Sequence, residues 1–160
     1  MERILEQIPR FFSGPNLTLL LEAAGLTLAM TLAGCLIGFG LAFVLVYLRQ
    51  TPGLWALPLR WICIAYVEVF RRIPFIVVIY LVLFFIQTVT PDASLFAIAV
   101  IAICLYAVAY TADIIRGGIE SVPLTQVEAA QAMNLSRLQT NIQIVLPQAW
   151  PVIIPPAIAF

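Results

Sequence analysis

The sequence predicts an all-α fold, a multi-span bundle of membrane helices of which about four spans are visible. Hydrophobic residues make up 63 % of the chain and charged residues 10 %, and the mean hydropathy is +1.07. A soluble domain of 160 residues could not cover that much apolar surface with polar groups, so the chain must use lipid as a solvent. Long apolar runs without charge supply the spans, since a helix needs about 20 apolar residues to cross a bilayer.

Composition also excludes several functions. The formal net charge is zero, so no strongly basic surface favours nucleic acid as a partner. Histidine, the commonest general base and metal ligand, is absent. The three cysteines each stand alone in an apolar run, without metal-ligand or redox spacing: Cys35, Cys63 and Cys104. We therefore expect no catalytic residues, no metal site and no cofactor in this chain.

The chain opens with a short segment and a first span. Residues 1–16 are predicted to form an amphipathic segment on the membrane surface, with apolar residues at helical spacing: Ile4, Leu5, Ile8, Phe11 and Phe12. Residues 23–48 carry no charge, and Arg49 and the turn at 51–53 end the run. Gly34 and Gly38 form a GxxxG pattern, which lets another helix approach closely. Packing within the same subunit is favoured over a dimer face.

Residues 54–89 allow two interpretations, because Glu68, Arg71, Arg72 and Pro74 interrupt the apolar run. One is a single tilted span with a proline kink. The other is a helix along the cytosolic interface over 54–70, followed by a span over about 73–89. We favour the second, because two adjacent arginines in the middle of the bilayer are costly. Glu68 has the spacing to pair with either arginine on a helix.

Two further apolar runs follow. One covers 95–112, and the other starts near Leu146, with Pro147 marking where the intervening loop meets it. The sequence ends at Phe160, which leaves the last run too short to span a bilayer. We expect the chain to be incomplete at its C-terminus, with a final span missing.

Arginine placement predicts the orientation. With the N-terminus outside, six arginines lie inside, at 49, 60, 71, 72, 116 and 137, and two lie outside, at 3 and 10. This asymmetry follows the positive-inside rule. It places the N-terminus outside the membrane and the polar loop over 120–147 in the cytosol.

That loop is the most informative stretch of the chain. Thr125 with Glu128, and Ser136 with Gln139, are each spaced as a capping box that starts a helix. Asn134 stands between them and suits the left-handed turn that ends a helix. The pattern predicts a helix, a sharp corner and a second helix, which is typical of a docking surface.

Other polar residues are weaker signals. Asp113 and Arg116 are spaced to pair with each other or with Glu120 on one helix. Polar groups at membrane depth are few: Thr27, Thr31, Tyr106, Tyr110, Thr111 and Gln87. Such groups are functional candidates, but threonine and tyrosine often only bond backbone in a helix bundle. The substrate-binding residues therefore stay open.

These motifs together resemble the permease subunits of type I bacterial ATP-binding-cassette importers, polar amino acid uptake branch. The resemblance covers about residues 17–160. It is carried by Glu128-Ala129-Ala130, the corner at Asn134 and Val145-Leu146-Pro147, which match the EAA loop; by Ala109 to Ile119; by Tyr66 to Pro74; and by Pro147-Gln148-Ala149 and Pro155-Pro156. The family usually has glycine at the corner, where this chain has Asn134, and Gly-Thr-Pro where it has Arg72-Ile73-Pro74. Its permeases also carry one more helix after this point.

The resemblance implies a single transmembrane permease domain over 1–160 in a bacterial inner membrane, which forms the translocation pathway and couples to a cytosolic ATPase. The coupling residues are then Glu128, Ala129, Ala130, Ala132, Met133, Asn134, Leu135 and Arg137. Structural roles in or near the loop fall to Thr125, Ser136, Pro147, Arg116, Gly117 and Gly118.

The partners implied are an ATPase dimer that binds ATP and magnesium, a second permease subunit (the same or homologous), a periplasmic or lipid-anchored solute-binding protein, and membrane lipid. The leading hypothesis is a transport subunit, without enzyme activity, for a polar amino acid or similar small solute. The alternatives are a permease of a sister branch that carries methionine, an opine or an oxyanion, and a membrane scaffold that recruits a partner without transport.

Overall fold

The computed structural model describes residues 14–51 and 53–159, and every regular element in them is helical. The elements in chain order are α2 (Gly14–Gln50), η1 (Leu54–Ala56), α3 (Leu57–Arg72), α4 (Phe75–Val89), α5 (Leu95–Glu120), α6 (Leu124–Ala132), α7 (Arg137–Thr140), η2 (Asn141–Val145) and α8 (Leu146–Ala159). The predicted all-α fold is confirmed. The surface segment predicted over 1–16 lies outside the described residues, except for 14–16, which belong to α2.

Within the part of the chain that the structure describes, three helices are long and apolar enough to cross a membrane: Gly14–Gln50, Leu95–Glu120 and Arg137–Ala159. The bent pair α3 and α4 counts as a fourth when it is taken as one broken span. Large apolar side chains are exposed along these helices, including Leu36 at 72 % and Phe85 at 72 %, and lipid can cover such faces. These helices agree with the predicted bundle of about four spans, but the last run was wrongly expected to be too short to span, because its helix begins at Arg137 and is 23 residues long.

The chain breaks sharply between α3 and α4. The two helices are bent by 114°, with Ile73 in an extended conformation at φ −87° and ψ 130°. Pro74 explains the break, because a proline disfavours the helical conformation in the residue before it. The predicted interruption at these residues is confirmed, and the segment is two helices with a corner rather than one gently kinked rod.

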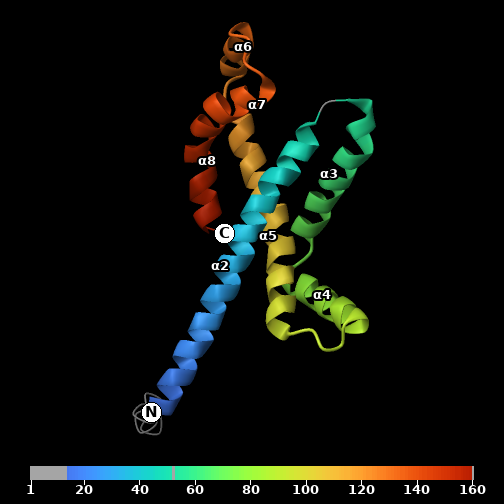
Figure 1. Ribbon diagram of the computed structural model, residues 1–160, viewed down its shortest axis with the longest axis vertical. Coiled ribbons are helices and arrows are strands. Elements are labelled where there is room, and N and C mark those ends of the chain that lie inside the picture. The colour runs from blue at the N-terminus through green and yellow to red at the C-terminus, as the bar shows by residue number, and fades with distance from the viewer. Residues whose placement is uncertain (1–13, 52, 160) are drawn as a thin grey trace.

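Helix α5 is the centre of the bundle, with α2, α3, α4 and α8 packed around it (Figure 1). Gly34 and Gly38 lie where α2 meets α5, and a Cβ added at Gly38 would stand 2.6 Å from the Cβ of Ala107. The GxxxG pattern therefore serves close packing inside this chain, as predicted. The core continues through Val46, Val67 and Ile115, which draws α2, α3 and α5 together.

The last helix starts earlier than the apolar pattern indicated. Helices α7, η2 and α8 form one helical stretch from Arg137 to Ala159, in which residues 141–145 form a π-helical turn. Pro147 lies in the first turn of α8 and does not begin the helix. A π turn fits here, because a proline lacks the amide of an ordinary α-helical bond. The second loop helix is thus rigidly continuous with the last span.

Candidate functional site

The polar loop lies at one end of the molecule, where α6 projects beyond the ends of α2, α5 and α8 (Figure 1). Its residues come between two long apolar helices, α5 and the stretch that begins with α7. A helical projection held on two spans is suited to binding a partner and passing on its movement.

Helix α6 begins differently from the prediction. The capping box between Thr125 and Glu128 is wrong: Pro123 is the N-cap residue, at φ −58° and ψ 135°, and no side chain caps the helix. Proline holds φ near the required value, and the turn closes with the Gln126 amide donating to the Pro123 carbonyl at 3.0 Å. Thr125 then lies within the first turn, where its backbone is helical and its hydroxyl does not cap the helix.

The corner after α6 is formed as predicted. Asn134 has φ 57° and is the non-glycine residue with positive φ in the described chain. The Leu135 amide donates to the Ala130 carbonyl at 3.1 Å, and the Asn134 amide donates to the Gln131 carbonyl at 2.9 Å. These two bonds are the Schellman pattern that closes a helix C-terminus.

The second predicted capping box is confirmed. The Gln139 amide donates to the Ser136 hydroxyl at 3.3 Å, and the Ser136 amide donates to the Gln139 side-chain oxygen at 2.8 Å. Both bonds hold the start of α7 at a defined angle to the corner. The corner geometry is therefore set by local hydrogen bonds.

Substitution of Asn134 tests the corner. We expect Asn134→Ala to destabilise the end of α6 by about 1 kcal/mol, because alanine tolerates the left-handed conformation poorly. Asn134→Gly should leave its stability unchanged or raise it, because glycine adopts positive φ without steric cost. Hydrogen–deuterium exchange of the Leu135 amide measures this, with about fivefold faster exchange expected for the alanine variant. Equal exchange in both variants would contradict the prediction.

The predicted coupling residues on and next to α6 differ in their exposure to solvent. Glu128, Ala129, Ala132 and Met133 are exposed, whereas Ala130 is 0 % exposed. Ala130 therefore packs inside the loop and is not available to a partner in this conformation. The exposed face also includes Leu124, which is 75 % exposed and belongs to none of the motifs in the sequence. A small, apolar tip with one carboxylate suits insertion into a groove.

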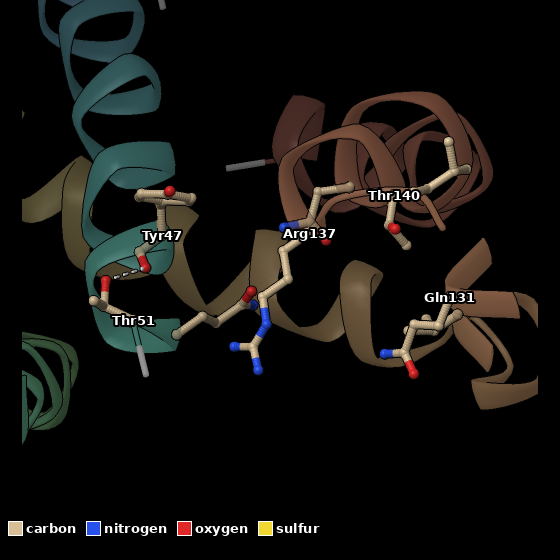
Figure 2. Close-up of a pocket in the computed structure, with 9 residues that line it drawn as sticks. Tyr47, Thr51, Gln131, Arg137 and Thr140 are labelled. Carbon is tan, nitrogen blue, oxygen red and sulfur yellow. Dashed lines mark hydrogen bonds between the residues drawn. The ribbon is translucent and has the colours of Figure 1, made fainter. Parts of the chain in front are cut away.

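Leu135 is half-buried and Arg137 is exposed, and both line a cavity of about 330 Å³ beside the loop. Figure 2 shows Arg137 reaching into the space between Thr51, at the end of α2, and Gln131 on α6. The C-terminal end of α2 thus faces the loop. The periodicity of apolar residues along the chain does not reveal this contact.

A network of ion pairs connects α3 with the C-terminal part of α5. Arg71 on α3 contacts the Asp113 carboxylate at 2.7 Å, and Arg116 contacts it at 2.8 Å. Arg116 also contacts Glu120 at 2.7 Å. The pairing of Asp113, Arg116 and Glu120 was predicted. Arg71 was not, because it comes from another helix.

The two glycines at this end of α5 differ. A Cβ added at Gly118 would collide with Ile153 of α8 and stand 3.3 Å from the Ala149 carbonyl, whereas nothing lies within 4 Å of one at Gly117. Gly118 therefore allows α5 and α8 to approach closely, and Gly117 has no such constraint.

Polar groups in the predicted spans mostly bond backbone. Thr27 and Thr31 donate to carbonyls four residues earlier at 2.8 and 2.9 Å, and Thr111 bonds Ala107 in the same way. Tyr110 donates to the Arg71 carbonyl at 3.1 Å. Within residues 14–51 and 53–159, no group of three or more histidine, cysteine or carboxylate side chains could hold a metal ion. The arrangement is that of a bundle with a projecting loop.

Comparison with known proteins places these features in context. Residues 53–159 match the family described as binding-protein-dependent transport system inner membrane component. An L-cystine transport system permease protein of Bacillus subtilis is 32 % identical over 130 residues, covering 81 % of this chain and 54 % of the relative. A glutamate/aspartate import permease protein of Escherichia coli is 34 % identical over 149 residues, covering 88 % and 65 %.

The fold is also similar to a solved structure. Inward-facing conformations of the MetNI methionine ABC transporter match with a TM-score of 0.74 and 26 % identity, covering 91 % of this chain and 69 % of that chain. The chain thus spans about half to two thirds of the length of the proteins it matches.

Proposed function

Because the chain belongs to the family of binding-protein-dependent transport system inner membrane components, we propose that it is a permease subunit of an ATP-binding-cassette importer. It forms half of the pathway for a polar amino acid and couples to a cytosolic ATPase through α6. Both curated relatives carry amino acids in their names, which supports this solute class over an oxyanion.

The observation that carries the proposal is the geometry of the loop. Helix α6 projects past the bundle (Figure 1), its tip exposes Leu124 at 75 % and Met133 at 64 %, and Glu128 is exposed beside them. The left-handed Asn134 and the cap at Ser136 connect this tip to a helix that continues without a break to Ala159. A push on α6 is therefore delivered to the last span.

The partners follow from this role. An ATPase dimer in the cytosol binds ATP and magnesium and seats α6 of each permease in a groove. A second permease subunit completes the pathway, and a solute-binding protein delivers the solute on the outer side. This arrangement places the N-terminus outside and the loop inside. It follows the asymmetry of the arginines, of which six are expected inside, at 49, 60, 71, 72, 116 and 137, and two outside, at 3 and 10.

The mechanism is a rigid-body switch. When the ATPase pair closes, it moves α6, and the packed helices α5 and α8 transmit the movement because they cannot deform continuously. The pathway then alternates between outward and inward access.

Reconstitution tests the function. The full permease, with the ATPase and solute-binding protein encoded beside it, is placed in liposomes, and ATP-dependent uptake is measured for amino acids, methionine, an opine and an oxyanion. We expect ATP-dependent uptake of a polar amino acid. Uptake of methionine, an opine or an oxyanion instead would assign the chain to a sister branch.

A loop variant provides the second arm. Glu128→Arg should abolish stimulated ATP hydrolysis while membrane insertion persists, because it reverses the charge of the exposed tip. Gln143→Arg is the control, since it adds an arginine at another exposed residue that lies on η2 rather than on α6. ATPase binding without uptake of any solute would support a scaffold and reject the transport function.

A further inference from the structure

The cavity beside the loop is built from three separate parts of the chain. Tyr47 and Gln50 come from the C-terminal end of α2, Gln131 from α6, and Arg137 and Asn141 from the start of the last helix. Figure 2 shows Arg137 extending between the α2 and α6 sides. The cavity measures about 330 Å³, which is large enough to receive a side chain of a partner.

The polar side chains of this cavity have unused hydrogen-bonding capacity. Among the described residues, no hydrogen bond or ion pair joins the side chains of Tyr47, Gln50, Gln131, Arg137 or Asn141 to another group. The two threonines that line it differ, since Thr51 donates to the Tyr47 carbonyl at 3.3 Å and Thr140 donates to the Ser136 carbonyl at 3.0 Å. The α7 terminus is also satisfied by its capping box, so it offers no free anion site.

The charge of the cavity is one-sided. Arg137 is the charged residue among those that line it in the described chain, and no carboxylate lies there. By contrast, Arg71, Arg72 and Arg116 are each paired with a carboxylate. A guanidinium presents a planar fork that matches a carboxylate with two parallel hydrogen bonds.

We propose that this cavity receives an acidic side chain of the ATPase subunit, so that the docking surface includes the C-terminal end of α2 as well as α6. The carboxylate binds Arg137, and neutral polar groups next to it bind Gln50, Gln131 and Asn141. The inference rests on the proposed function, because it requires the ATPase partner.

Continuity with α6 favours the ATPase as the occupant. Gln131 lies on the same short helix as Glu128 and Ala129, so a partner seated on the tip of α6 reaches the mouth of the cavity. The C-terminal end of α2 is also held in place. The Arg60 side chain donates twice to the carbonyl of Thr51, the residue after α2, once from Nε at 2.7 Å. The partner would therefore contact the first span and the coupling loop at once.

The first test uses matched charge changes. The full permease in lipid nanodiscs binds the ATPase encoded beside it, and the affinity is measured for Gln50→Glu, Arg137→Gln and Gln143→Glu. Each variant changes the net charge by the same amount, but Gln143 does not line the cavity. We expect Gln50→Glu and Arg137→Gln to bind about tenfold more weakly than the wild type, and Gln143→Glu to bind within twofold of it. Equal weakening by all three, or wild-type binding by Gln50→Glu, would overturn the proposal.

The second test identifies the occupant. A photoreactive residue replaces Gln50, and another replaces Gln87 on α4, toward the other end of the molecule (Figure 1). We expect position 50, and not position 87, to cross-link to an acidic segment of the ATPase. Cross-linking of position 50 only to lipid, or Arg137-dependent binding of a free amino acid to the permease alone with no cross-link to the ATPase, would overturn the proposal.

The measured binding distinguishes a failure of the proposed function from a failure of this inference alone. If the wild-type permease does not bind the ATPase, the proposed function and this inference both fall. If the wild type binds and Glu128→Arg abolishes binding while position 50 gives no cross-link, this inference alone is wrong.

Discussion

Leucine in place of Gly118 is expected to destabilise the bundle by about 3 kcal/mol, the upper part of the range for overpacking a core. Even the first carbon of a side chain at this position would collide with Ile153, which is 0 % exposed, and would lie 3.3 Å from the backbone carbonyl of Ala149. Helices α5 and α8 would have to separate. Because these helices flank the loop, uptake should be lost together with stability.

Gly117→Leu is the control for this prediction. Gly117 is the preceding residue of the same helix, and an added Cβ there meets nothing within 4 Å. Both variants gain the same helix propensity, so a difference between them reports packing alone. Thermal unfolding in mild detergent measures it. A Gly118→Leu protein that melts at the same temperature as Gly117→Leu would show that α5 and α8 are not in close contact.

Loss of the Asp113 charge is expected to have the second largest effect. Asp113→Asn leaves Arg71 and Arg116 without their shared carboxylate, on side chains that are 39 % and 34 % exposed. Such exposure lies between a buried pair, whose disruption costs about 3–5 kcal/mol, and a surface pair worth about 0–1 kcal/mol. We expect destabilisation of about 2 kcal/mol, with loosening of the corner between α3 and α4.

Glu68→Gln is the matched control. It removes one carboxylate from the pair with Arg72, whose side chains are 55 % and 80 % exposed, so its effect should be near zero. Thermal unfolding and hydrogen exchange in α3 compare the two variants. Equal stability of both would show that the pairs of Asp113 contribute no more than a surface contact.

Much of the fold follows from local patterns. The apolar runs locate the spans because the cost of unsatisfied backbone in lipid leaves helices as the way to cross. Asn134 and the pair of Ser136 and Gln139 predicted the corner and the second helix start correctly, since their hydrogen bonds join residues only a few positions apart. The family resemblance rests on these same short motifs.

Errors arose where two local signals competed. Thr125 and Glu128 have the spacing of a capping box, but the N-cap residue of α6 is Pro123, two residues before Thr125. A proline needs no amide partner and is already held near helical φ, so it prevails over a threonine hydroxyl. Pro147 was expected to mark where the loop meets the last apolar run, whereas a π turn joins α7 to α8 in one helical stretch.

The sequence by itself determined the membrane class, the spans, the corner and the family, because each depends on composition or on neighbours within one helical turn. Only the tertiary structure decided which face of α6 is exposed and that Ala130 is buried. It also decided that Arg71 forms an ion pair with Asp113, and that the C-terminal end of α2 forms a cavity with Arg137. The physical reason is that these contacts join segments that are distant along the chain. Their meeting is set by how α2, α3 and α8 pack around α5 and not by any local preference.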